Sequence, residues 1–187
     1  MKSLSLGLVL LVSWYDAAAS ARADGGNICE REMIAASSAE NVPLGVLYAV
    51  ALTETGRKGA LHPYALNIEG KAVLASSKQE ALAAFWGARR SGKVLIDLGC
   101  MQINHHYHGA EFPSVQAMLD PRANVRYAAH FLKALRRQEG SWAMAVARYH
   151  AGPDNDPAQK RYICAVIGNL AATGFGSWTP EARSFCR

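Results

Sequence analysis

The chain has 187 residues, of which 50% are apolar, and a formal net charge of +5 at pH 7. This length and composition are sufficient for one domain with a buried core. The modest positive charge suits binding to an anionic polymer. However, the sequence has no basic stripe with interleaved aromatic residues, so it does not indicate a nucleic-acid-binding protein.

Residues 1–23 have the pattern of a secretory signal peptide. A positively charged start precedes an apolar run from Leu4 to Trp14, which is too short to span a bilayer, and Ala21-Arg22-Ala23 forms a small-x-small cleavage site. We therefore expect cleavage after Ala23 and export to the periplasm. A single domain over residues 24–187, without a membrane anchor, is expected to remain.

The rest of the chain predicts an all-α domain with one short extended insertion. Helices are expected over 27–40, from Pro43 to just before Gly56, from Ser77 to about Ser91, briefly after Ser114, from Pro121 to about Gln138, from Ser141 to Tyr149, and from Asp156 to Gly174. Between the second and third helices, apolar residues alternate around Glu69-Gly70, which is typical of a hairpin. Residues 94–109 show no sustained period and are expected to form a loop or a brief turn.

Four cysteines, Cys29, Cys100, Cys164 and Cys186, could form disulfides after export. Four cysteines allow three full pairings, and the sequence does not rank them. Cys29 and Cys186 near the two ends, with Cys164 on a helix, are the candidates for one bridge. Cys100 lies in an apolar loop and is expected to remain a buried thiol. The spacing of the four matches no zinc site.

One carboxylate stands out because of its position. Glu54 ends a helix that is apolar nearly all round from Val42 to Leu52, and Gly56 follows closely. Such surroundings favour the neutral, protonated form of a carboxyl group, which is the form that a general acid needs. An ordinary solvated glutamate at a helix end would occupy the same position, so further evidence is needed.

That evidence comes from three motifs in a fixed order. They are Glu54-Thr55-Gly56, Gly99-Cys100-Met101-Gln102-Ile103-Asn104 and Ala147-Arg148-Tyr149-His150-Ala151-Gly152. Together with Tyr162 on the last helix, they resemble the soluble lytic transglycosylase family over residues 29 to about 167. The resemblance implies a lysozyme-like helical fold. Residues 62–70 are similar to an insertion in small specialised members associated with secretion, conjugation or flagellar assembly.

The chain departs from the commonest family pattern at three positions. Thr55 replaces serine and keeps a hydroxyl group, and Cys100 replaces leucine and keeps a small apolar side chain. His150 replaces asparagine, so it keeps hydrogen-bonding capacity but can also titrate. None of these changes removes the carboxylate.

The resemblance implies a reaction that needs one carboxylate and no cofactor. Glu54 would act as the acid toward the bond after N-acetylmuramic acid, and the N-acetyl oxygen of that sugar would relieve the developing positive charge. Glu54 would then deprotonate the C6 hydroxyl, so that 1,6-anhydromuramic acid forms without water. Most glycosidases instead use a second carboxylate as nucleophile or base.

Further residues are implied to bind the glycan strand of peptidoglycan. They are Thr55, Met101, Gln102, Asn104, Tyr149, His150 and Tyr162. The Gln102 amide can offer a donor and an acceptor to an N-acetyl group. Tyr149 is a candidate to hydrogen-bond Glu54, to stack on a sugar or to fill the core, whereas Tyr162 is expected mainly to pack. Met101 is expected to line the groove floor or to fill the core.

Three alternatives compete with this interpretation. A hydrolase of the goose-type lysozyme kind would hold water with a second carboxylate, for which Asp97 is the candidate, although capping of the following turn is its simpler role. A catalytically silent wall-binding or assembly module would not need Glu54. A metal site at His105-His106-Tyr107-His108 is not expected, because side chains on a loop point in different directions. The residues do not identify a secretion, conjugation or flagellar assembly partner.

Overall fold

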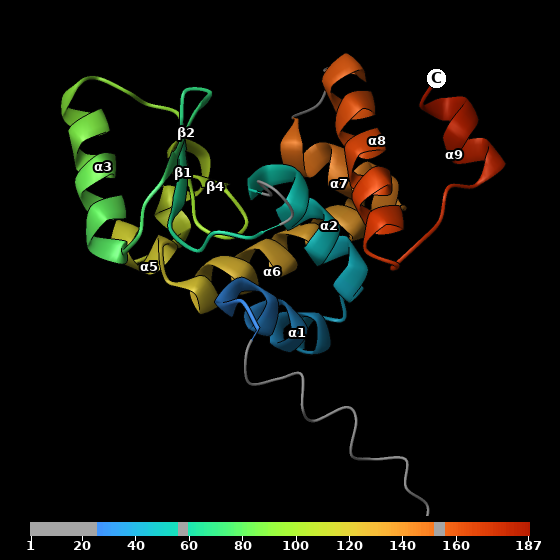
Figure 1. Ribbon diagram of the computed structural model, residues 1–187, viewed down its shortest axis with the longest axis horizontal. Coiled ribbons are helices and arrows are strands. Elements are labelled where there is room, and N and C mark those ends of the chain that lie inside the picture. The colour runs from blue at the N-terminus through green and yellow to red at the C-terminus, as the bar shows by residue number, and fades with distance from the viewer. Residues whose placement is uncertain (1–25, 56–59, 152–155) are drawn as a thin grey trace, which may run out of the picture.

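The computed structural model describes residues 26–55, 60–151 and 156–187, so the predicted signal peptide lies outside the described residues. The fold is mostly helical and lysozyme-like, with a small antiparallel sheet (Figure 1). The helices are α1 Ile28–Glu40, α2 Leu44–Thr55, α3 Lys78–Arg90, α4 His105–His108, the 3-10 helix η2 Gly109–Glu111, α5 Val115–Met118, α6 Pro121–Glu139, α7 Trp142–His150, α8 Asp156–Ala172 and α9 Pro180–Phe185. The strands are β1 Ala65–Ile68, β2 Lys71–Leu74, β3 Ile96–Leu98 and β4 Ile103–Asn104.

Helix α2 is buried because it is apolar on nearly every side. Leu47, Val50 and Ala51 have no exposed surface, and α2 packs against both α1 and α8. Full burial of a side chain the size of Leu47 contributes about 2 kcal/mol. Figure 1 shows the sheet and α3 on one side of the molecule, α7 and α8 on the other, and α6 crossing between them, with α2 near the centre. The last residues of α2 therefore lie where these parts meet.

The predicted helix starts are confirmed by side-chain caps. Ser77, Ser114, Asp120 and Ser141 each accept a hydrogen bond from the backbone N–H three residues ahead. Gly140 ends α6 with a φ of 77°, a left-handed conformation that glycine adopts without steric cost. Helix α9 was not expected, because its six residues are too few to show a helical period.

The predicted hairpin is confirmed, but the sheet is larger than expected. Strands β1 and β2 pair from Ala65 opposite Leu74 to Ile68 opposite Lys71. The expectation of loop or turn over 94–109 was wrong, because β3 pairs with β1, β4 pairs with β3, and α4 and η2 follow. Strands of two or three residues are too short for an alternating pattern, and only their hydrogen bonds to β1 and to each other reveal them.

A fully buried amide holds the turn between β3 and β4. Asn124 of α6 accepts a hydrogen bond from the Met101 N–H at 2.9 Å and donates to the carbonyl groups of Leu98 and Met118, both at 2.9 Å. Gly99 lies directly against it, with a φ of 80°, and a Cβ atom there would lie 2.6 Å from the Asn124 amide nitrogen. Only glycine combines that backbone conformation with so close an approach.

The cysteine expectations are corrected in one respect. Cys100 is not a free thiol but is bonded to Cys29, and a second disulfide joins Cys164 to Cys186. The buried location predicted for Cys100 was right, since it has no exposed surface, but buried Cys29 of α1 lies beside it. That approach depends on how α1 packs against the turn, so sequence position could not reveal it.

Replacement of Asn124 by leucine should destabilise the protein strongly. Leucine has the same branched shape with somewhat larger end groups but cannot hydrogen-bond. The change removes the partner of one buried N–H and two buried carbonyl groups, so we expect a loss of about 3 kcal/mol or more in urea unfolding. Ser77→Ala, which removes one exposed cap, should cost only about 1 kcal/mol. A loss for Asn124→Leu no larger than for Ser77→Ala would contradict the structural role assigned to this amide.

The two disulfides should contribute separately to stability. Their partners are 71 and 22 residues apart, which corresponds to about 4 kcal/mol for Cys29–Cys100 and about 3 kcal/mol for Cys164–Cys186 in the chain-entropy model. Double alanine variants of each pair, compared by chemical unfolding, should show the larger loss for the first pair. Peptide mapping with and without reductant tests the pairing itself, and recovery of a free Cys100 peptide without reduction would refute it.

Candidate active site

A cavity of about 800 Å³ opens between the sheet and the C-terminal helices, with the end of α2 in its wall. This volume lies in the range of small-molecule binding sites. Among the predicted site residues, the cavity is lined by Glu54, Gln102, Asn104, Tyr149 and His150. Asp97, the candidate second carboxylate, lines it as well. Segments far apart in the sequence therefore meet at one cavity.

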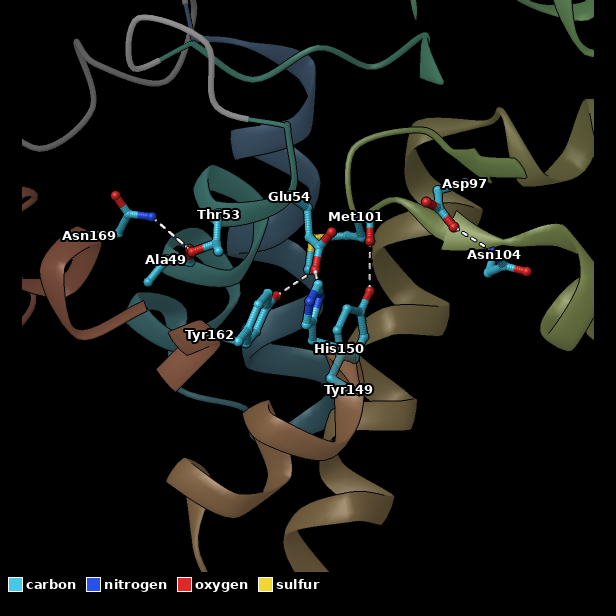
Figure 2. Close-up of polar contacts among 10 residues, drawn as sticks. All are labelled: Ala49, Thr53, Glu54, Asp97, Met101, Asn104, Tyr149, His150, Tyr162 and Asn169. Atoms are coloured by element: carbon cyan, nitrogen blue, oxygen red, sulfur yellow. Dashed lines mark hydrogen bonds and ion pairs between the residues drawn. The ribbon is translucent and has the colours of Figure 1, made fainter. Parts of the chain in front are cut away.

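Glu54 is held from one side by two aromatic rings. The Tyr162 hydroxyl donates a hydrogen bond to Glu54 Oε1 at 2.6 Å, and His150 Nδ1 lies 3.5 Å from the same oxygen (Figure 2). Only 16% of the Glu54 side chain is exposed. Both contacts use Oε1, so Oε2 carries no hydrogen bond from the residues that the structure describes. Glu54 thus lines the cavity with one oxygen bound and the other without a hydrogen bond.

Tyr162 contacts the carboxylate, contrary to the expectation that it mainly packs. It is 5% exposed on α8, and burial, together with the nearby Glu54 carboxylate, raises the pKa of its hydroxyl well above the usual range. The phenol therefore stays protonated and acts as a donor to Glu54. Its ring also stacks on the His150 imidazole, with centroids 4.1 Å apart and planes 8° from parallel.

A second contact, which sequence reasoning missed, fastens α2 to α8 one residue before Glu54. Asn169 of α8 donates to the Thr53 hydroxyl at 2.9 Å, and that hydroxyl donates to the Ala49 carbonyl at 2.7 Å (Figure 2). The contact fixes the end of α2 relative to Tyr162. An asparagine in a mostly apolar stretch of α8 was the available signal, but its partner lies 116 residues away.

Tyr149 does not bond to Glu54, which was one of its expected roles. Its hydroxyl donates to the Met101 carbonyl at 2.8 Å, and Figure 2 shows it directed there rather than at the carboxylate. Burial and the neighbouring carboxylates of Glu54 and Asp97 raise the pKa of this hydroxyl well above its usual range. The Met101 side chain is fully buried and belongs to the core, the second of its two expected roles.

Gln102 projects from the turn with a φ of 46°, an uncommon conformation for a residue with a side chain. Its amide nitrogen donates to the carbonyl groups of Ala65 and Gly99, at 3.1 and 3.0 Å. The side-chain amide thereby ties the turn to β1. Its oxygen accepts no hydrogen bond from the described residues, so an acceptor remains in the cavity wall.

Asp97 and Asn104 face each other across the strand pair β3 and β4. Asn104 Nδ2 donates to Asp97 Oδ1 at 2.7 Å, and the Asn104 oxygen caps α4 by accepting from the His106 N–H (Figure 2). Asp97 Oδ1 therefore bonds Asn104 across the strand pair, rather than capping the turn that follows Asp97 as its simpler expected role had it. Burial raises the pKa of the Asp97 carboxyl and the Glu54 carboxylate adds to this, while the Asn104 hydrogen bond partly offsets both.

Thr55 and Tyr107 lie at the edges of the described site. Thr55 is the last residue of α2, and its side chain lies outside the described part of the chain. Tyr107 was not singled out from the sequence for binding, yet it lines the cavity with 70% of its surface exposed. An exposed aromatic ring beside a cavity can stack on a flat apolar face of a ligand. The sequence signal for Tyr107 was its position as an aromatic residue three positions after the second motif, which ends at Asn104.

The histidine-rich segment forms the short helix α4 and not a loop. His105 packs on the Phe85 ring, and His108 Nδ1 lies 2.8 Å from the Tyr127 hydroxyl, so these imidazoles have different partners. Among residues 26–55, 60–151 and 156–187, no group of three His, Cys, Asp or Glu side chains could hold a metal ion. Within the same residues, no helix is long and apolar enough to cross a membrane.

Comparison with known proteins agrees with this arrangement. The family model described as the transglycosylase SLT domain matches residues 31–165, which include Glu54, the turn at Gln102 and Tyr162. Neither the curated proteins nor the solved structures yielded a match. The family model covers most of the chain and the whole candidate site, so this protein belongs to the transglycosylase SLT family, whose members are lytic transglycosylases acting on peptidoglycan.

Proposed function

We propose that this chain is an exported lytic transglycosylase that cleaves the β-1,4 bond between N-acetylmuramic acid and N-acetylglucosamine and leaves a 1,6-anhydromuramic acid end. The observation that carries the proposal is Glu54, which lies in the wall of the cavity with Oε1 bound by Tyr162 and Oε2 open. A carboxyl group in that position can exchange a proton with a ligand through one oxygen while the other is held in place.

The reaction proceeds in two proton transfers through Glu54. The protonated carboxyl gives its proton to the glycosidic oxygen as the bond to the muramic acid C1 breaks, and the substrate's N-acetyl oxygen bonds to C1. The carboxylate then removes the proton from the C6 hydroxyl, whose oxygen attacks C1 and displaces the N-acetyl oxygen. Glu54 ends in its starting form, and no water is consumed.

Tyr162 has the geometry to assist the half of the cycle in which Glu54 is charged. A hydroxyl that donates to a carboxylate at 2.6 Å stabilises the negative charge created by proton transfer to the leaving oxygen. Because the contact is made to Oε1, it leaves Oε2 without a hydrogen bond from the described residues. We therefore assign Tyr162 a role in charge stabilisation and Glu54 the proton transfers.

The other predicted binding residues lie on two sides of the cavity. The Gln102 oxygen and the Asn104 side chain offer polar contacts from the sheet side, and Tyr149 and His150 offer ring surfaces from α7. Tyr107 adds an exposed ring for sugar stacking. The contact proposed between Thr55 and the glycan rests on the family resemblance alone. Met101 acts on the site through its carbonyl group, which holds the Tyr149 hydroxyl, and not through its side chain.

A hydrolase is the second candidate function, supported by one specific observation. Asp97 lines the same cavity as Glu54, and the nearby Glu54 carboxylate contributes, after burial, to raising the pKa of the Asp97 carboxyl. A second carboxylate facing the substrate could hold a water molecule for attack at C1. The transglycosylase proposal is preferred because the family model covers the whole site and the reaction needs only one carboxylate.

The cellular setting is part of the proposal. The signal-peptide pattern of residues 1–23 supports export to the periplasm, where peptidoglycan is accessible. Residues 62–70, which include β1 and the turn to β2, resemble an insertion in small members associated with secretion, conjugation or flagellar assembly. We propose local opening of the wall for such an envelope-spanning machine.

Glu54→Gln should abolish the release of anhydromuropeptides from purified peptidoglycan. The amide keeps the shape but cannot donate or accept the proton, so we expect a rate at least about a thousandfold lower, measured by mass spectrometry of the soluble products. Glu40→Gln is the matched control, because Glu40 is similarly buried, with 14% of its side chain exposed, on the distant α1. Products carrying one additional water would establish the hydrolase instead, and full activity of Glu54→Gln would remove the catalytic assignment.

Tyr162→Phe should lower kcat by about ten- to a hundredfold and change KM little. The estimate follows from the loss of one hydrogen bond to a charged group, about 1.5–3 kcal/mol. Tyr48→Phe is the matched control, since Tyr48 donates to Glu30 Oε1 at 2.7 Å in the same chemical arrangement away from the cavity. Equal kcat in the two variants would mean that Tyr162 only packs.

A further inference from the structure

His150 is oriented by its neighbours so that one ring nitrogen faces the carboxylate. Its ring lies flat on Tyr162, and this stacking leaves Nδ1 3.5 Å from Glu54 Oε1 (Figure 2). The side chain is also 44% exposed, so its ring can exchange protons with solvent. The charge of a titratable group that is held against Glu54 and exposed to water depends on the solvent pH and acts on the carboxylate.

The charged groups around His150 come from every element that forms this part of the site. Glu54 of α2 lies closest, and the Asp97 carboxyl of β3 also interacts with the imidazole electrostatically. Tyr162 of α8 is neutral, and on α7 itself Arg148 is engaged with Glu139 at 3.0 Å. Among the described residues, the imidazole therefore faces two carboxyl groups and a neutral phenol.

We propose that His150 sets the protonation state of Glu54 and limits the gain of acid-loaded enzyme at low pH, because its protonated ring holds Glu54 as a carboxylate. This inference rests on the proposed function, in which Glu54 must begin the cycle with a proton. The imidazolium stabilises the charged carboxylate relative to the acid, so fewer molecules carry the proton that the leaving oxygen requires. Neutral His150 exerts no such attraction.

Protonation of His150 also slows the second proton transfer. A carboxylate that is paired with an imidazolium is a weaker base toward the C6 hydroxyl than an unpaired one, since accepting a proton breaks the ion pair. Protonation of His150 therefore lowers both the population of the acid form of Glu54 and the basicity of its carboxylate. As pH falls through the His150 titration, the acid-loaded, ring-neutral form that the reaction uses therefore increases less than it would beside a residue that stays neutral.

The first test compares pH–rate profiles of the wild type and His150→Asn between pH 5 and 8. Asparagine keeps a polar group that can bond Glu54 but cannot become a cation. We expect the ratio of variant to wild-type kcat to rise about threefold or more from pH 8 to pH 5, whatever its value at pH 8. His130→Asn is the matched control, because His130 Nδ1 lies 3.6 Å from Glu40 Oε2 outside the cavity, and its ratio should stay flat. A flat ratio for His150→Asn would overturn the proposal.

The second test does not require catalysis. The imidazole of His150 is titrated by NMR in the wild type and in Glu54→Gln, with His130 as an internal reference in the same spectra. Removal of the Glu54 charge should lower the midpoint of His150 by about half a pH unit or more and leave that of His130 in place. An unchanged His150 midpoint would refute the coupling. If the wild type releases no anhydromuropeptide, the proposed function fails while this titration still decides whether His150 and Glu54 are coupled.

Discussion

The site depends on the buried amide of Asn124, which binds the turn between β3 and β4 from beneath. Its hydrogen bonds to Leu98, Met101 and Met118 satisfy backbone groups that would otherwise be buried without partners. Gly99 permits the approach, and the disulfide from Cys100 ties the same turn to α1. This turn places Gln102 in the cavity wall and the Met101 carbonyl against the Tyr149 hydroxyl.

The other wall of the cavity is organised by the contact between α2 and α8. The apolar character of α2 buries the helix, and the Asn169 contact to Thr53 fixes its end, so that Glu54 meets Tyr162 and His150. One oxygen of the carboxylate is occupied and the other is open, which suits a group that must hold its position while it transfers protons. The same arrangement exposes Glu54 to any charge that His150 carries.

Much of the fold could be predicted because helix signals are local. The caps at Ser77, Ser141 and Asp120 lie within three residues of the groups they bind, and the hairpin pattern around Glu69-Gly70 spans only a few positions. Strands β3 and β4 were missed because strands of two or three residues carry no period of their own. The Cys29–Cys100 bridge was missed for a related reason, since its partners meet only after α1 packs on the turn.

The sequence by itself determined the helical class, the candidate carboxylate Glu54 and the order of motifs that marks the family, because each depends on residue type and short spacing. Only the tertiary structure decided which aromatic residue touches the acid. Tyr149 was the candidate to bond Glu54 and Tyr162 was expected mainly to pack, but the packing of α8 on α2 brings Tyr162 to Glu54 across 108 positions of sequence while α7 directs Tyr149 to the Met101 carbonyl. Side-chain partners of this kind depend on the relative placement of whole helices, which no local pattern encodes.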